Sequence, residues 1–142
     1  MASLPDAISF YENELTQAKL ETSLRGNLET SSKMMPGIVE NRFSQLQEQE
    51  AILEYLNVQL RKKRSDVFRR YLENYNKELS SREVDKYVDG DDEVVHWQIL
   101  INEFSLVRNK FLGLMKALDS KQFQINNITK LRCAGLEDAV LA

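Results

Sequence analysis

The chain has 142 residues and a formal net charge of −3, and 42% of its residues are hydrophobic and 29% charged. This composition is typical of a single folded, charge-rich domain and excludes a disordered chain. No apolar run approaches the length of a membrane span, and the first residues lack the apolar stretch of a secretory signal. The lone cysteine, Cys133, has no partner for an internal disulfide, so a reducing, cytoplasmic setting is expected.

The first predicted helix covers residues 4–24, where apolar residues alternate at four- and three-residue spacing. Ser3 and Asp6 stand at capping-box spacing at its start. Residues 25–37 are rich in Gly, Asn, Ser and Thr and include Pro36. They are predicted to form a linker with a weak helical turn.

A long second helix is predicted from Ile38 to about Leu79, because apolar residues recur there every seven positions. In a coiled coil two positions of each heptad face the partner helix. The second of these positions holds aromatic and polar residues here, which is unfavourable for a simple dimeric coiled coil. A second apolar flank indicates that this helix faces two neighbours. Ser80 and Glu83 then have capping-box spacing, which favours a short helix over a strand.

The third long helix is predicted to open at the acidic run 89–93 and to carry a heptad stripe. Because no isolated hairpin covers so broad an apolar face, we expect self-association. A last short helix is predicted after Asp119-Ser120, and residues 136–142 are expected either to fray or to dock on a neighbour. The predicted oligomer interface consists of Trp97, Leu100, Phe104, Val107, Phe111, Leu114, Leu118, Phe123, Ile125 and Ile128.

These elements predict an all-α fold, with long helices in a hairpin-like arrangement and short terminal helices. The whole chain, 1–142, is interpreted as one helical domain. Its parts are an N-terminal helix and linker (1–36), a long basic helix (37–79) and a C-terminal oligomerisation region (80–142).

Histidine and cysteine, the usual metal ligands and catalytic residues, are scarce in this chain. His96 and Cys133 are each the only residue of their kind, so soft ligands alone cannot build a zinc site. The acidic run 89–93 lacks the calcium-loop pattern and is interpreted as the start of a helix. No glycine-rich phosphate loop is present. We therefore expect no enzyme activity, no cofactor and no metal.

Six of the nineteen positive charges lie within residues 61–70. A local cationic patch on an acidic chain, followed by tyrosines, is a candidate site for a nucleic-acid backbone with unpaired bases. The alternative is a solvated helix face whose cations pair with Glu48, Glu50, Glu54 and Glu73, and the pattern alone favours neither. The candidate DNA-binding residues are Arg61, Lys62, Lys63, Arg64, Arg69, Arg70, Tyr71 and Tyr75.

The C-terminal half resembles the phage UvsY recombination-mediator family. The resemblance is carried by Tyr87-Val88-Asp89-Gly90-Asp91-Asp92-Glu93-Val94-Val95, a heptad helix, and Asp119-Ser120-Lys121-Gln122-Phe123-Gln124-Ile125-Asn126-Asn127-Ile128. It covers roughly residues 36–135. The chain departs from the family after the basic helix, where it reads Leu72-Glu73-Asn74-Tyr75-Asn76, and at Leu131-Arg132-Cys133-Ala134.

The resemblance implies a ring-like homo-oligomer that binds single-stranded DNA in the cytoplasm of a phage-infected bacterium. Such a protein helps a RecA-like recombinase to displace single-strand-binding protein, and the resemblance assigns DNA contact to Lys62, Lys63, Arg64, Arg69 and Arg70. Two other functions stay open: a structural or scaffolding coiled-coil oligomer without a DNA-binding role, and a non-specific single-strand binder without a mediator role.

Overall fold

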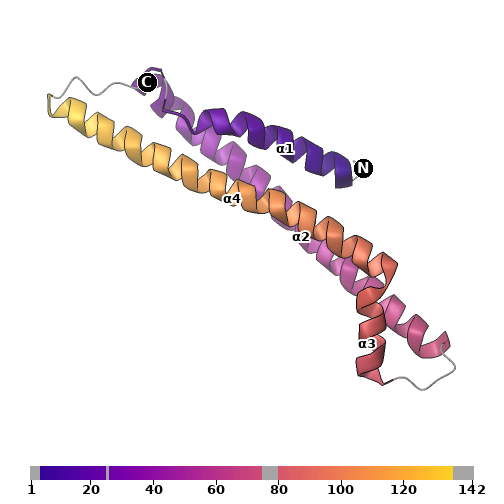
Figure 1. Ribbon diagram of the computed structural model, residues 1–142. Coiled ribbons are helices and arrows are strands. Elements are labelled where there is room, and N and C mark those ends of the chain that lie inside the picture. Colours follow the sequence, from indigo (N-terminus) through magenta and orange to yellow (C-terminus); the bar gives the residue numbers. More distant parts are fainter. Residues whose placement is uncertain (1–3, 25, 75–79, 136–142) are drawn as a thin grey trace. The chain divides into compact units, whose positions relative to one another are not determined.

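The computed structural model describes residues 4–24, 26–74 and 80–135, and these ranges contain helices and no strand (Figure 1). The predicted all-α fold is therefore confirmed for the described residues. The helices are α1 (Leu4–Glu21), α2 (Leu28–Asn74), α3 (Ser81–Gly90) and α4 (Asp92–Cys133). By their contacts the residues form two compact units. The first unit is Met1–Glu48 with Val107–Ala142, and the second unit is Gln49–Leu106.

Helix α2 begins at Leu28, whereas the sequence predicted a linker up to Gly37. Asn27 caps the helix, because its Oδ1 accepts a hydrogen bond from the backbone N–H of Glu29 at 2.7 Å. Pro36 usually ends a helix because it lacks an N–H, yet it is accommodated inside α2. The predicted linker was therefore mostly wrong. The helix is described up to Asn74, and the rest of the prediction, residues 75–79, lies outside the described part.

The short helix predicted after Ser80 is confirmed as α3. Ser80 Oγ accepts from the backbone N–H of Glu83, and Glu83 Oε2 accepts from that of Ser80, both at 3.3 Å. The separate last helix predicted after Asp119-Ser120 is wrong, because α4 runs unbroken from Asp92 to Cys133. Asp119 and Ser120 are exposed, so these polar residues face solvent without interrupting the helix.

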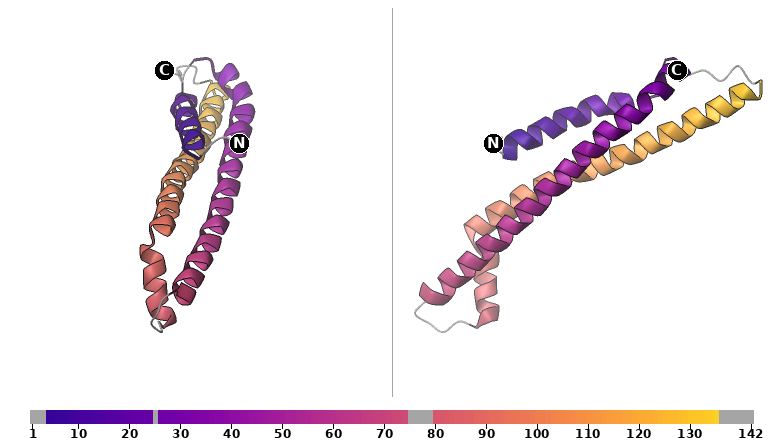
Figure 2. Two further views of the ribbon diagram at one scale, coloured as in Figure 1. Left: turned by 90° about the vertical axis from the view of Figure 1, so that its right-hand side faces the viewer. Right: turned by 180° about the vertical axis from the view of Figure 1, so that it is seen from behind.

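The first unit packs α1 against parts of α2 and α4 (Figure 2). The ring of Tyr11 meets that of Phe111 edge-on, with centroids 6.0 Å apart, and the Tyr11 hydroxyl donates to Glu48 at 2.9 Å. Each fully buried large apolar side chain contributes about 1.5–3 kcal/mol of gross hydrophobic free energy. The buried apolar residues here are Tyr11, Leu15, Ala18, Met35, Leu46, Val107, Phe111, Leu114, Leu118 and Ile125.

A buried polar network also ties α1 to α2 in the first unit. Arg42 is 3% exposed, and its guanidinium binds Glu14 at 2.6 Å and Glu21 at 2.7 Å. Gln45 accepts from Arg42 and donates to Glu14. The hydrogen bond to Glu21 raises the pKa of Arg42, so the cation stays charged despite its burial. Lys121 of α4 also reaches α1, where its Nζ donates to the Glu21 carbonyl at 2.6 Å.

The second unit packs α3 against α2 and the first turns of α4. Its core also holds Gln49, whose two side-chain polar atoms have no hydrogen-bond partner among the described residues. An unsatisfied buried amide costs about 1–3 kcal/mol. The apolar core residues of this unit are Leu53, Leu56, Leu60, Val67, Val84, Val88, Val94, Ile101 and Phe104.

Replacing Arg42 with Ala is expected to lower the free energy of unfolding by about 3–5 kcal/mol, because two mostly buried carboxylates lose their cation. Urea denaturation measures this change. Lys33→Ala is the control, because it breaks the exposed pair with Glu29 at 3.0 Å, which is worth at most about 1 kcal/mol. Equal losses in the two variants would contradict a structural role for the network.

Glu14 predicts a pH dependence. Hydrogen bonds from Gln45 and then from Arg42 hold its pKa below the ordinary value. Its contribution to stability is therefore full above the unfolded pKa, about 4.3, and is lost as pH falls through the lower folded pKa. Wild-type protein should lose more stability between pH 5 and pH 3 than Glu14→Gln does. Glu12→Gln, which changes an exposed carboxylate of the same helix, should follow the wild-type profile in urea titrations.

Candidate nucleic-acid interface

The basic segment, residues 61–70, lies on α2 in the second unit. Leu60 and Val67 are buried and fix which side of the helix faces the core. Because seven residues make nearly two turns, the cations separate into an outward-facing set and two flanks. The sequence predicted one cationic patch, and the helix divides it into parts with different surroundings.

The outer cationic face consists of Arg61, Lys62, Ser65 and Arg69, all of them exposed. The exposed Asp66, four residues after Lys62 and three before Arg69, is the carboxylate on the same side of the helix. Ser65 stands four residues from Arg61 and Arg69 and three from Lys62, so it lies between the three cations on the helix surface. Within the described part of the chain, these three cations make no ion pair or hydrogen bond through their side chains. From Arg61 to Arg69 the helix rises about 12 Å. This face is open to an anionic ligand.

The flanking cations, by contrast, are held by two carboxylates at the junction of α3 and α4. Lys63 Nζ lies 2.7 Å from Glu93 Oε2, and Arg70 Nη2 lies 3.8 Å from the same oxygen. Arg64 Nη2 lies 2.6 Å from Asp89 Oδ1. The hydrogen bond from Lys63 lowers the pKa of Glu93. We call Asp89 and Glu93 the acidic junction.

The carboxylates that pair with Lys63, Arg64 and Arg70 are not among the four that the sequence analysis named. Glu48, one of the four named, accepts a hydrogen bond from Tyr11 instead. The carboxylates of the acidic junction follow the basic segment by about 20 to 30 positions in the chain, so no helical spacing relates them to it. Only the packing of α3 and the start of α4 beside α2 brings them together. These are exposed or half-exposed pairs, which contribute little to stability.

The sequence predicted two tyrosines beside the cations, and the structure describes one of them. Tyr71 is half-buried and stacks on Tyr87 of α3, with centroids 5.4 Å apart and an interplanar angle of 21°. One face of the Tyr71 ring is therefore already covered by Tyr87. Tyr75 lies outside the described residues. Sequence reasoning interpreted Tyr87 only as an apolar residue of a short helix.

Tyr55 is an aromatic neighbour of the outer cationic face that sequence reasoning missed. It is 56% exposed and stands seven residues before Lys62 and fourteen before Arg69. The three side chains therefore follow one line along the helix. The sequence does contain a signal for Tyr55. It precedes Lys62 by seven residues, the same period as the apolar stripe, but on the outer side of α2. A polar-aromatic ring beside cations is a typical surface for stacking unpaired bases.

The residues of the predicted oligomer interface differ in how exposed they are. Trp97, Leu100 and Ile128 are half-buried, and Phe123 is 63% exposed. Self-association stays a prediction, and a contact that leaves the core closed has to use apolar residues that the chain leaves uncovered, such as Ile99, Leu106 and Phe123. The residues already buried within the single chain are Phe104, Val107, Phe111, Leu114, Leu118 and Ile125.

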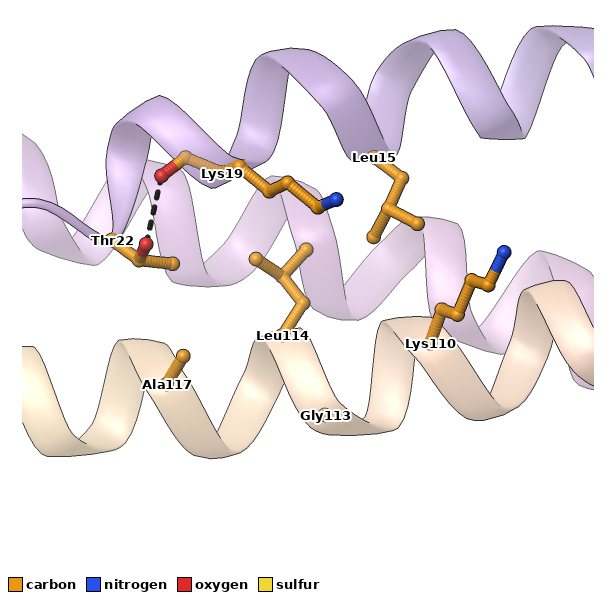
Figure 3. Close-up of a pocket in the computed structure, with 7 residues that line it drawn as sticks. All are labelled: Leu15, Lys19, Thr22, Lys110, Gly113, Leu114 and Ala117. Carbon is orange, nitrogen blue, oxygen red and sulfur yellow. Dashed lines mark hydrogen bonds between the residues drawn. The ribbon is translucent and has the colours of Figure 1, made fainter.

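The surface of the described residues also has hollows. In the second unit, Lys63 and Glu93 line one of about 340 Å³ together with Asp92, His96 and Trp97. In the first unit, a groove of about 350 Å³ lies between α1 and α4 (Figure 3). We call it the lysine-flanked groove. It is lined by Leu15 and Lys19 of α1, by Thr22 just after that helix, and by Lys110, Gly113, Leu114 and Ala117 of α4.

Across the described ranges, no three His, Cys, Asp or Glu side chains gather closely enough to hold a metal ion. None of the described helices combines the length and apolar character needed to cross a membrane. Comparisons with protein-family models, curated proteins and solved structures found no match to this chain.

Proposed function

We propose that this protein is a recombination mediator. In this role it binds single-stranded DNA without sequence preference, assembles into a ring-like homo-oligomer, and promotes loading of a RecA-like recombinase against single-strand-binding protein. The observation that carries the DNA-binding part is the outer cationic face: three exposed cations lie together on a chain of net charge −3. The mediator part and the partners rest on the resemblance to the phage UvsY family.

The outer cationic face suits a sugar–phosphate backbone. Lys62, Arg61 and Arg69 meet successive phosphates along the helix, and the Ser65 hydroxyl adds a donor between them. Backbone contacts of this kind release counterions, so affinity falls steeply with salt and does not depend on base sequence. Tyr55, on the same line of the helix, offers a ring on which an unpaired base stacks.

The flanking cations also bind the strand, by exchanging their carboxylate partners for phosphates. Lys63, Arg64 and Arg70 leave the carboxylates of the acidic junction and turn to phosphates as the strand binds. The exchange is inexpensive because the pairs are exposed and weak. The acidic junction thus lowers the affinity of one subunit, so tight binding requires several subunits to hold one strand. Such distributed, reversible contact suits a protein that must release the strand to a recombinase.

One observation favours the scaffolding alternative: half of the basic segment's cations are already paired within the chain. In that case the outer cationic face would bind an acidic protein and not a strand. Oligonucleotide binding separates the two functions. A scaffold shows no affinity for single strands even in dilute buffer.

Replacing Arg61, Lys62 and Arg69 together with Ala should weaken binding to all single-stranded sequences alike. The slope of log affinity against log salt should fall by about one for each phosphate contact removed. Fluorescence anisotropy with labelled homopolymers measures both. The matched control changes three exposed lysines elsewhere, Lys86, Lys116 and Lys130, to Ala. If both triple variants lose the same affinity, net charge and not the outer cationic face governs binding.

The mediator step is tested on single strands coated with single-strand-binding protein. Wild-type protein should accelerate recombinase filament assembly on them, and the Arg61, Lys62, Arg69 variant should not. Strand binding without acceleration would identify a non-specific single-strand binder in place of a mediator.

Glu93→Gln is expected to tighten strand binding, because Lys63 and Arg70 lose a competing carboxylate. The gain should be about threefold, as for an exposed ion pair of modest strength. Glu103→Gln is the control, since it removes the same charge from an exposed site on the same helix. Unchanged or weaker binding by Glu93→Gln, at equal helicity by circular dichroism, would contradict the exchange of partners.

A further inference from the structure

The lysine-flanked groove is formed by apolar and small residues between two cations. Leu15 and Leu114 point into it from α1 and α4, and Lys19 and Lys110 stand on either side (Figure 3). Lys19 and Lys110 are exposed. A ligand that fills such a groove needs aliphatic side chains for the apolar lining and carboxylates for the two ammonium groups.

The chain itself contains a segment with this chemistry. Residues 136–141 read Leu-Glu-Asp-Ala-Val-Leu, so two adjacent carboxylates are followed by aliphatic side chains. This segment lies outside the described residues. It follows α4 directly, after Gly135, whose φ of +88° is a left-handed conformation that ends helices.

The segment is too short to reach the groove of its own chain. From Ala117, at the near edge of the groove, to Cys133, the helix rises about 24 Å. An extended chain from Gly135 to Leu141 spans at most about 20 Å, and it would also have to reverse direction along α4. If this segment fills such a groove, the groove therefore belongs to another copy.

We propose that residues 136–141 of one copy occupy the lysine-flanked groove of a second copy. Glu137 and Asp138 pair with Lys19 and Lys110, while Val140 and Leu141 cover the apolar lining. The inference deepens the assembly part of the proposed function and does not depend on DNA binding. Each copy then donates one segment and receives another, which is a heterologous contact, and such contacts close into a ring when the rotation between copies permits.

A charge swap tests the pairing. Lys19→Glu with Lys110→Glu should lower the oligomeric mass, and so should Glu137→Lys with Asp138→Lys. Combining all four substitutions restores opposite charges in every copy and should restore the mass. Light scattering at micromolar concentration measures it. Failure of the fourfold variant to recover assembly, or full assembly by either double variant, overturns the proposal.

Gly113 offers a second test that does not change charge. A Cβ added there meets no atom within 4 Å, so the backbone at this position has room for a side chain to start. Gly113→Leu fills the groove and should reduce assembly. The control is Gly37→Leu in α2, where a Cβ also meets open space and where the mass should not change. If both variants assemble like wild type, the groove is not the contact.

Oligonucleotide binding by the same variants distinguishes the possible failures. If the Lys19, Lys110 variant keeps its mass but loses strand affinity, the groove belongs to the DNA path and this inference falls. If wild-type protein is monomeric at all concentrations, both the inference and the assembly part of the proposed function fail, whatever its affinity for DNA. If wild type assembles and the variants do too, only this inference fails.

Discussion

The apolar stripe of α4 has to be covered, and the chain covers much of it with its own helices. Phe104, Phe111 and Leu118 are fully buried within a single copy, and burial of such side chains is the main source of favourable folding free energy. The cover includes α1, whose Tyr11 ring meets Phe111, and the apolar side of α2. The apolar side of α2 therefore faces the core, and its cations lie on the outer side and on the flanks of the helix.

Ion pairs serve two different purposes in this chain, and burial separates them. Arg42 is nearly inaccessible and satisfied by three side chains, so its loss would strand charges away from water. Arg64 and Lys63 hold their carboxylates at the surface, where water and salt replace either partner readily. The first kind fixes how α1 and α2 pack, whereas the second kind leaves a surface that can change partners.

Local patterns in the sequence were sufficient for the all-α fold, the capped start of α3 and most of the α4 stripe, because periodicity and capping depend on neighbours in the chain. The start of α2 was misjudged because Pro36 and Gly37 were interpreted as the end of a linker, whereas both lie inside the helix that Asn27 caps. For the candidate site, the sequence revealed which cations gather but not their partners. Asp89 and Glu93 reach the basic segment only through tertiary packing, which no local spacing encodes.

The position of Trp97 has a practical consequence. It is the only tryptophan of the chain, and its indole borders the hollow that also holds Lys63 and Glu93. Tryptophan emission of the unlabelled protein therefore comes from this neighbourhood alone. The only thiol, on Cys133, is exposed at the far end of the same helix and accepts a dye without competing sites. The native chain thus carries one spectroscopic reporter in each of its two compact units.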